Sequence, residues 1–102
     1  MFAVIFRATV GKQDQDYLAM VETMRSLAFD KYHCLDFIAL TEGDQEVAIS
    51  YWNSEADIQA WHRDPQHQQA QQLGRGKWYR DYRVQVVEVK RDYSFSGADD
   101  DR

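Results

Sequence analysis

The chain of 102 residues is long enough for one hydrophobic core and too short for two, so we expect a single domain over residues 1–95. Hydrophobic residues at 44% argue against a disordered chain, and the net charge of −5 argues against a surface built as a whole for nucleic acid or anionic lipid. No stretch approaches the roughly 20 apolar residues of a membrane span, and a single cysteine, Cys34, fits a reducing compartment. These features predict a cytoplasmic protein that binds neither nucleic acid nor membrane.

The first half of the chain predicts a strand, a helix and a hairpin. Residues 2–10 alternate between two largely apolar faces and predict a strand, since Arg7 interrupts the apolar run that a secretory signal would need. Apolar residues at helical spacing predict an amphipathic helix from about 14 to 29. Residues 34–52 predict two antiparallel strands joined at 42–45, where Gly and Asp favour a tight turn.

Two helix-start signals follow in the second half. Ser54 is typical of an N-cap, with Asp57 three residues later, and a second start is predicted at Asp64-Pro65, because proline is favoured at the first position of a helix. The helix should therefore restart at Pro65 instead of continuing straight. From there one row of residues faces the core, while the glutamines between them form mostly a solvated face; the row comprises His67, Ala70 and Gly74.

A valine-rich segment, residues 82–95, predicts the last strand, and residues 96–102 predict a flexible acidic tail. The resulting order is β-α-β-β-α-β, which predicts an α+β, ferredoxin-like fold: a four-stranded antiparallel sheet with helices on one face. The strands are apolar on both faces, and two helices can cover only one of them. A second copy of the chain should cover the other face, so we expect a homodimer.

The second half also carries a series of short motifs within VAISYWNSEADIQAWHRDPQHQQAQQLGRGKWYRDYRVQVVEVKRDYSF, residues 47–95. In chain order they are a strand ending in Trp52, a helix start at Ser54-Glu55, Trp61, a Pro-x-His element at 65–67, Gly74-Arg75, Trp78-Tyr79, Tyr82 and a closing valine-rich strand. This pattern resembles the antibiotic biosynthesis monooxygenase (ABM) superfamily, in its branch of small proteins called heme-degrading monooxygenase-like. The topology of the resemblance covers most of residues 1–95.

The resemblance implies a dimeric α+β barrel with a pocket between the sheet and the helices of each subunit. It also implies oxygenation of a quinol, an aromatic polyketide or heme without a dedicated flavin or metal. We therefore expect a cofactor-independent monooxygenase whose partner is a small aromatic or quinol-type molecule. Two alternatives stay open: a non-catalytic dimer of the same fold that binds a small ligand, and a divergent heme-binding or heme-degrading member.

Three positions indicate whether the chain carries the residues that heme-degrading members use. Trp61 matches the tryptophan that enzymes of the family place in the pocket. Heme-degrading members carry an iron-ligating histidine ten residues later, where this chain has Gln71, and an asparagine on the first strand, where it has Arg7. Since two of these three residues differ, we do not expect heme degradation. His67 could ligate iron instead only if the helix were rotated or shifted.

His67 and Trp61 are the candidate catalytic residues. A neutral imidazole can take a proton from a phenol or quinol near pH 7, and the resulting anion can react with dioxygen. Alternatively, His67 bonds a backbone group at the helix junction and Trp61 only packs in the core. The candidate substrate-binding residues, which include groups able to stabilise negative charge, are Arg7, Arg75, Tyr79 and Tyr82.

Metal and nucleic-acid sites are not expected. His62 and His67 are five residues apart, about 140° around a helix, and Pro65 lies between them, so they should not pair on one face as metal ligands. Basic and aromatic residues alternate over 75–83, as in some RNA-binding sheets, but the RNA-recognition hallmark is absent and the chain is acidic.

Overall fold

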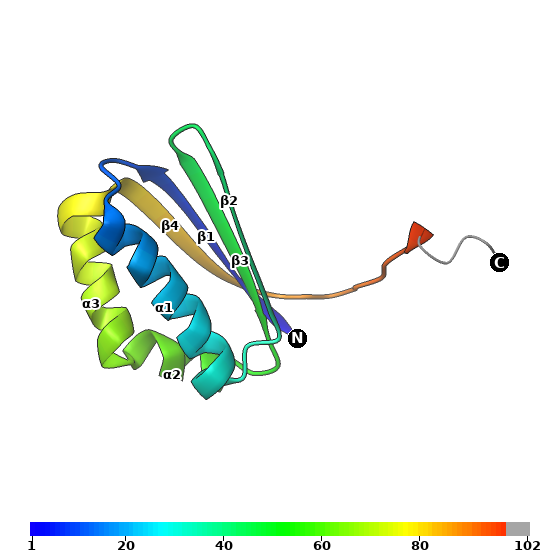
Figure 1. Cartoon of the computed structure of the whole chain (residues 1–102). Coiled ribbons are helices and arrows are strands. Elements are labelled where there is room, and N and C mark those ends of the chain that lie inside the picture. The colour runs from blue at the N-terminus through cyan, green and yellow to red at the C-terminus, as the bar shows by residue number, and fades with distance from the viewer. Residues whose placement is uncertain (98–102) are drawn as a thin grey trace.

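The computed structural model describes residues 1–97, which form four strands, three helices and a π-helical turn. The elements are β1 (Phe2–Val10), α1 (Gln15–Tyr32), β2 (Asp36–Glu42), β3 (Gln45–Trp52), α2 (Glu55–Arg63), α3 (Pro65–Leu73), the turn η1 (Gly74–Trp78) and β4 (Tyr79–Glu88). The strands form one antiparallel sheet in the order β2-β3-β1-β4. All three helices lie on one face of this sheet (Figure 1), which confirms the predicted ferredoxin-like α+β fold.

Helix α1 is capped at both ends. The Asp14 side chain accepts a hydrogen bond from the backbone N–H of Tyr17 at 2.9 Å, which satisfies one of the unpaired amides of the first turn. At the other end His33 takes a left-handed conformation with φ 65°, and its N–H bonds the carbonyl of Ala28. The helix therefore runs three residues past the predicted end at residue 29, because no glycine or proline stops it earlier.

The strand register separates two faces of the sheet. Phe6 of β1 pairs with Ala48 of β3, and both line the space under the helices. The adjacent residue Ile5 pairs with Ile49, which in turn pairs with Ile38 of β2, so an isoleucine row crosses the opposite, helix-free face. Ile38 is 47% exposed. The predicted apolar residues on both faces are thus confirmed for β1 and β3, whereas β4 presents Asp81, Arg83 and Gln85 to the helix-free face.

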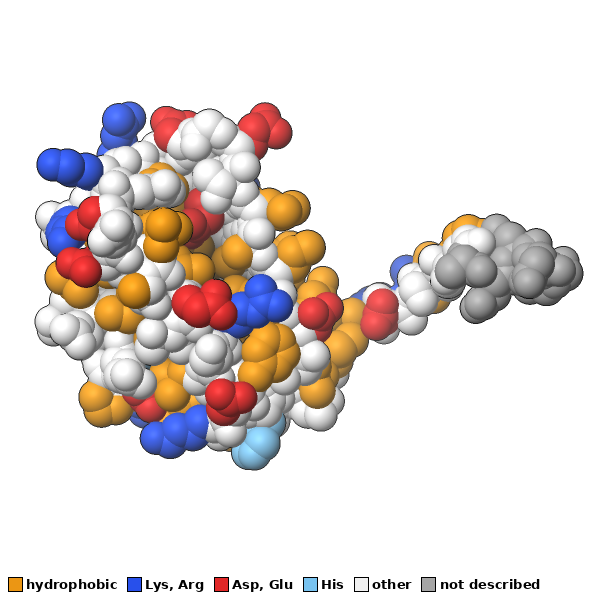
Figure 2. Space-filling view, viewed as in Figure 1, with side chains coloured by type: hydrophobic (Ala, Val, Ile, Leu, Met, Phe, Trp, Pro, Cys, Tyr) orange, Lys and Arg blue, Asp and Glu red, His pale blue; other side chains and the backbone are white. Residues whose placement is uncertain are grey.

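Strand β4 differs from the predicted strand over residues 82–95: it begins at Tyr79 and ends at Glu88. Its partner explains the end, since Phe2, the first residue of β1, pairs with Glu88, and the N–H of Val89 bonds the carbonyl of Met1. The segment that follows projects from the body of the protein (Figures 1 and 2); of the predicted flexible tail, residues 98–102 lie outside the described residues.

The core lies between the helices and the sheet and is centred on indole rings. Trp52, at the end of β3, is fully buried, and its ring centroid is 5.1 Å from that of Trp61 on α2. Trp52 Nε1 donates to Ser50 Oγ at 2.8 Å, so its polar edge is satisfied inside the core. Within residues 1–97, no helix is long and apolar enough to span a membrane.

Candidate functional site

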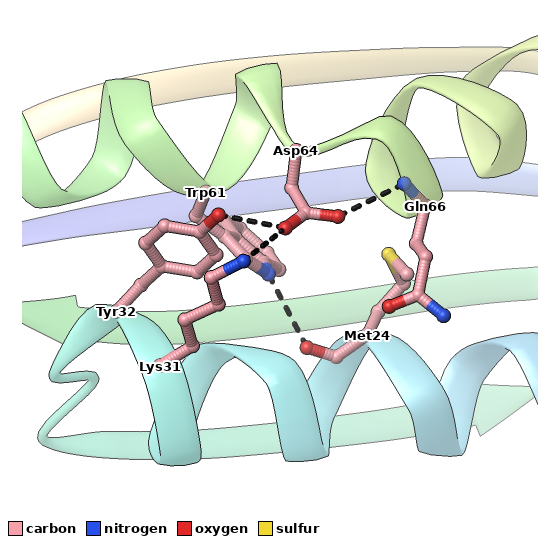
Figure 3. Close-up of polar contacts among 6 residues, drawn as sticks. All are labelled: Met24, Lys31, Tyr32, Trp61, Asp64 and Gln66. Carbon is pink, nitrogen blue, oxygen red and sulfur yellow. Dashed lines mark hydrogen bonds and ion pairs between the residues drawn. The ribbon is translucent and has the colours of Figure 1, made fainter.

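A hydrogen-bonded junction sets the angle between α2 and α3 (Figure 3). Asp64, buried between the two helices, caps α3 by accepting from the N–H of Gln66 at 2.9 Å, and Pro65 occupies the first helical position as predicted. The same carboxylate accepts from the hydroxyl of Tyr32 at 2.6 Å and lies 3.5 Å from Nζ of Lys31, both at the end of α1. The Tyr32 hydrogen bond, followed by that of Gln66, lowers the pKa of Asp64. The helix break is therefore tied to α1.

Trp61 is fixed from two sides. Its indole Nε1 donates to the carbonyl of Met24 on α1 at 3.2 Å (Figure 3), and the side chain is buried. Beyond the junction the chain turns back, so that the His67 ring meets the Trp61 ring edge-to-face with centroids 4.4 Å apart. The junction thus brings the two predicted catalytic residues into contact.

A cavity of about 350 Å³ lies between the helices and the sheet, within the size range of small-molecule sites. Both Trp61 and His67 line it, and most of its wall is aromatic or aliphatic. Helix α3 buries none of its residues fully, because the cavity lies beneath it. The polar side chains that reach the cavity are Tyr17, Glu46, His62, His67, Gln71, Tyr79 and Tyr82.

These polar residues form two groups. The first, here called the imidazole group, consists of His62, His67 and Gln71 at the α2–α3 junction. The two rings lie 4.8 Å apart between centroids. The five-residue spacing and the intervening Pro65 led us to expect no same-face pair of metal ligands here, but the bend at Pro65 brings the two rings side by side. Among residues 1–97, no group of three or more His, Cys, Asp or Glu side chains could hold a metal ion.

Both imidazoles are neutral near pH 7. Burial, together with the nearby His62, lowers the pKa of His67 from 6.5 to about 4, and burial also lowers the pKa of His62. In a neutral imidazole one nitrogen carries a proton and the other accepts a hydrogen bond. The hydrogen-bond partners of His67 determine which of its two ring nitrogens carries the proton and which one accepts.

A directional chain of hydrogen bonds assigns the protonated nitrogen of His67. Arg75 can only donate, and its Nη2 lies 3.2 Å from Oε1 of Gln71. The amide orientation of Gln71 is thereby set, so its Nε2 donates to Nδ1 of His67 at 2.9 Å. Nδ1 is then the acceptor, and Nε2 carries the proton. Arg75 also donates through Nε to the hydroxyl of Tyr82 at 2.9 Å.

The second group, here called the carboxyl group, consists of Glu46, Tyr17 and Tyr79. Glu46 is only 8% exposed; its Oε1 accepts from the hydroxyl of Tyr17, and its Oε2 accepts from the hydroxyl of Tyr79 at 3.2 Å. Burial raises the pKa of Glu46, and the Tyr79 hydrogen bond opposes that shift. Burial and the nearby Glu46 raise the pKa of Tyr79, which therefore stays a hydroxyl donor.

Our sequence-based prediction included neither Glu46 nor Tyr17 among the site residues. A signal was present, since Glu46 alternates with Ala48, Ser50 and Trp52 along β3 and so shares their face of the sheet. A carboxylate on an otherwise apolar and small-residue face marks a buried acid.

The structure places most of the other predicted site residues around the cavity. Tyr79 and Tyr82 line it directly, whereas Arg75 is exposed outside the lining and donates hydrogen bonds to Gln71 and Tyr82, which belong to it. Arg7 does not join them: it pairs with Val47 and Arg83, is exposed, and lies on the helix-free face. Because side chains alternate along β1, its inward-facing residues are Phe6 and Ala8 instead of Arg7. The predicted core-facing row does line the cavity; it consists of His67, Ala70 and Gly74.

Comparisons with known proteins agree with this architecture. A family model described as antibiotic biosynthesis monooxygenase matches residues 1–73. The uncharacterized protein YqjZ of Bacillus subtilis (strain 168) is 36% identical over 95 residues, which cover 92% of this chain and 83% of YqjZ.

Solved structures share the fold at lower sequence identity. Rv0793 from Mycobacterium tuberculosis superposes with a TM-score of 0.76 at 18% identity, over 91% of this chain and 98% of Rv0793. A mutant of SnoaB from Streptomyces nogalater, described as a cofactor-independent oxygenase, has a TM-score of 0.75 at 12% identity, over 89% of this chain and 94% of SnoaB. On the extent of the family match and the identity with YqjZ, the chain belongs to the antibiotic biosynthesis monooxygenase family.

Proposed function

We propose that this protein oxidises a small aromatic hydroxyl compound of the quinol type with dioxygen and without a flavin, heme or metal. The observation that carries the proposal is the cavity of about 350 Å³, which combines an aromatic wall with a neutral imidazole in contact with Trp61. The fold shared with SnoaB, a cofactor-independent oxygenase, supports the same reaction type.

Each predicted site residue at the cavity has a role in this proposal. Trp61 forms the flat wall against which the aromatic substrate packs, with the His67 ring at its edge. His67 donates from Nε2 to the substrate oxygen and stabilises the negative charge that develops there. Its hydrogen bond from Gln71 occupies Nδ1, so His67 acts as a donor in place of the base suggested by its residue type.

The substrate is the reductant in this reaction. An electron-rich aromatic anion transfers electrons to dioxygen; one oxygen atom enters the product, and the second leaves as water with protons from the substrate. Arg75, held by Tyr82 and Gln71 beside the cavity, lowers the energy of the anion through its positive charge. Tyr79 completes the wall near Glu46.

We also propose that two copies of the chain associate through the helix-free face of the sheet. Ile38 and Leu40 on this face are 47% and 67% exposed, and the row of Ile5, Ile49 and Ile38 runs across it. An exposed apolar patch of this kind over β2, β3 and β1 is unfavourable in contact with water, and a symmetry-related sheet would cover it.

Oxygen consumption tests the reaction directly. Purified protein is mixed with a benzoquinol or an anthrol, and oxygen uptake is followed with an electrode. We expect uptake above the rate of the uncatalysed reaction, and a loss of roughly 10²-fold or more in kcat/KM in His67→Ala, because removing one donor to an oxyanion typically costs that much. Trp61→Phe should lose most of the activity as well.

His33→Asn is the matched control for His67→Ala. The His33 side chain is 80% exposed, it is outside the cavity lining, and asparagine tolerates its left-handed backbone. Full activity is expected in this variant. If wild-type protein binds the aromatic compound, as seen by quenching of tryptophan fluorescence, but consumes no oxygen, the protein is a non-catalytic binder and the oxygenase proposal is wrong.

A further inference from the structure

The carboxyl group occupies a part of the cavity wall that the roles given to Trp61 and His67 leave unused. Glu46 belongs to β3, Tyr17 to α1 and Tyr79 to β4, so three elements converge on one carboxyl. Its orientation is set because each oxygen accepts one tyrosine hydroxyl. A carboxylate oxygen has about two acceptor sites, so each oxygen keeps one for a further donor.

Among residues 1–97, no positively charged side chain forms an ion pair with the carboxylate of Glu46. The ion pairs of that part of the chain do not include Glu46, and the titratable side chains that share its cavity are the tyrosines and the neutral His62 and His67. A buried carboxylate without a cation is a stronger base than an exposed one, because desolvation disfavours its charged form. The geometry thus presents an oriented and basic acceptor to a bound molecule.

The cavity needs such an acceptor. A phenol or quinol must lose its hydroxyl proton before it becomes the electron-rich anion that dioxygen oxidises. His67 is unsuited to this step, since its Nδ1 is occupied by Gln71 and its Nε2 already carries a proton. Of the cavity-lining groups within residues 1–97, Glu46 is the one carboxyl.

We propose that Glu46 is the proton acceptor of this cavity, taking the proton of a ligand hydroxyl while Tyr17 and Tyr79 hold the carboxyl in place. In this step the O–H bond of the ligand breaks, its electron pair stays on the ligand oxygen, and a new O–H bond forms on Glu46. No electrons pass to another molecule. The assignment rests on the proposed aromatic hydroxyl substrate, and it restricts the ligand to compounds with an ionisable hydroxyl.

Proton transfer can be measured without oxygen, using 4-nitrophenol, whose anion absorbs visible light and whose neutral form does not. Under anaerobic conditions below the pKa of the free phenol, binding to wild-type protein should produce the visible absorption of the anion. The infrared difference spectrum should gain the carbonyl band of a protonated carboxylic acid. In Glu46→Gln the carboxylic acid band should be lost, and the bound anion should fall at least tenfold.

Three variants make the assignment specific. Glu42→Gln, at the exposed end of β2, removes a carboxylate outside the cavity and should leave both signals unchanged. Tyr79→Phe keeps the carboxyl but removes a hydrogen bond to Oε2, so it should shift the carboxylic acid band even if Glu46→Gln fails to fold. With an oxidisable quinol, Glu46→Gln should lower kcat/KM roughly 10²–10⁴-fold, the usual loss for a general base.

The proposal is overturned if wild-type protein binds only the neutral phenol, fails to bind it, or forms the anion without a carboxylic acid band. It is also overturned if Tyr79→Phe leaves that band unshifted. These results are separate from the oxygenase test. Proton transfer with no oxygen uptake from any quinol would sink the oxygenase proposal and retain Glu46 as the acceptor.

Discussion

At the scale of single residues, His67 makes stability depend on pH. Its pKa in the folded protein is about 4, against 6.5 for an ordinary histidine, so the unfolded chain binds more protons between these two values. The free energy of unfolding should therefore fall as the pH is lowered from about 6.5 to about 4, by up to about 3 kcal/mol from this residue. Urea unfolding of wild type and His67→Gln across this range measures the effect.

The expected result is a shallower dependence on pH in His67→Gln than in wild type over the same window. His62 and the carboxylates contribute to the slope in both proteins, so the difference between the two curves isolates His67. Parallel curves would mean that folding does not lower the pKa of this imidazole, which would contradict its burial in a neutral state.

At the scale of elements, the turn η1 helps to position the carboxyl group, because the backbone of Gly74 lies close to the ring of Tyr79. A Cβ built on Gly74 would lie 2.9 Å from Cδ2 of Tyr79, whereas one on Gly76 would meet no atom of the described part of the chain within 4 Å. Gly74→Ala should therefore displace the Tyr79 ring, weaken its hydrogen bond to Glu46 and destabilise the fold by about 1 kcal/mol or more.

Gly76→Ala is the matched control, because both substitutions reduce the conformational freedom of the unfolded chain in the same way. It should be neutral or slightly stabilising in urea unfolding, and it should bind 4-nitrophenol as wild type does. Gly74→Ala should bind the phenol more weakly. Equal stability and equal binding of the two variants would show that Tyr79 adjusts without disturbing the cavity.

At the scale of the whole molecule, the helix-free face predicts the oligomeric state. Wild-type protein should sediment as a dimer at micromolar concentration, and Ile38→Lys should shift it to a monomer by placing a charge at the β2 end of the isoleucine row. Leu18→Lys, on the outer side of α1 where the side chain is 64% exposed, should leave the mass of the dimer unchanged. A monomeric wild-type protein would contradict the proposed association.

The fold was predictable because its signals are local. The alternation of β1, the turn at Gly43 and the caps at Ser54 and Asp64 each depend on neighbours in sequence, and all appear where the pattern placed them. Element ends were less predictable. Strand β4 stops at Glu88 because its partner begins at Phe2, and no local pattern contains that information.

The candidate site was predicted only in part. Trp61 and His67 were found because the chain carries a family pattern around them, and the structure brings their rings together. Arg7 was placed in the site by the same pattern, yet the alternation of β1 turns it to the helix-free face. Glu46 was overlooked because its importance comes from Tyr17 and Tyr79, which lie 29 and 33 residues away in sequence.

The sequence by itself determined the order of elements, the break at Pro65 and the apolar character of both sheet faces, because each follows from residues a few positions apart. The tertiary structure alone decided the chemistry of the cavity. Burial and the hydrogen bond from Gln71, one turn along the same helix, make His67 a donor, and hydrogen bonds from two distant elements orient Glu46 as an acceptor. Protonation states depend on desolvation and on partners in space, and neither can be read from spacing along the chain.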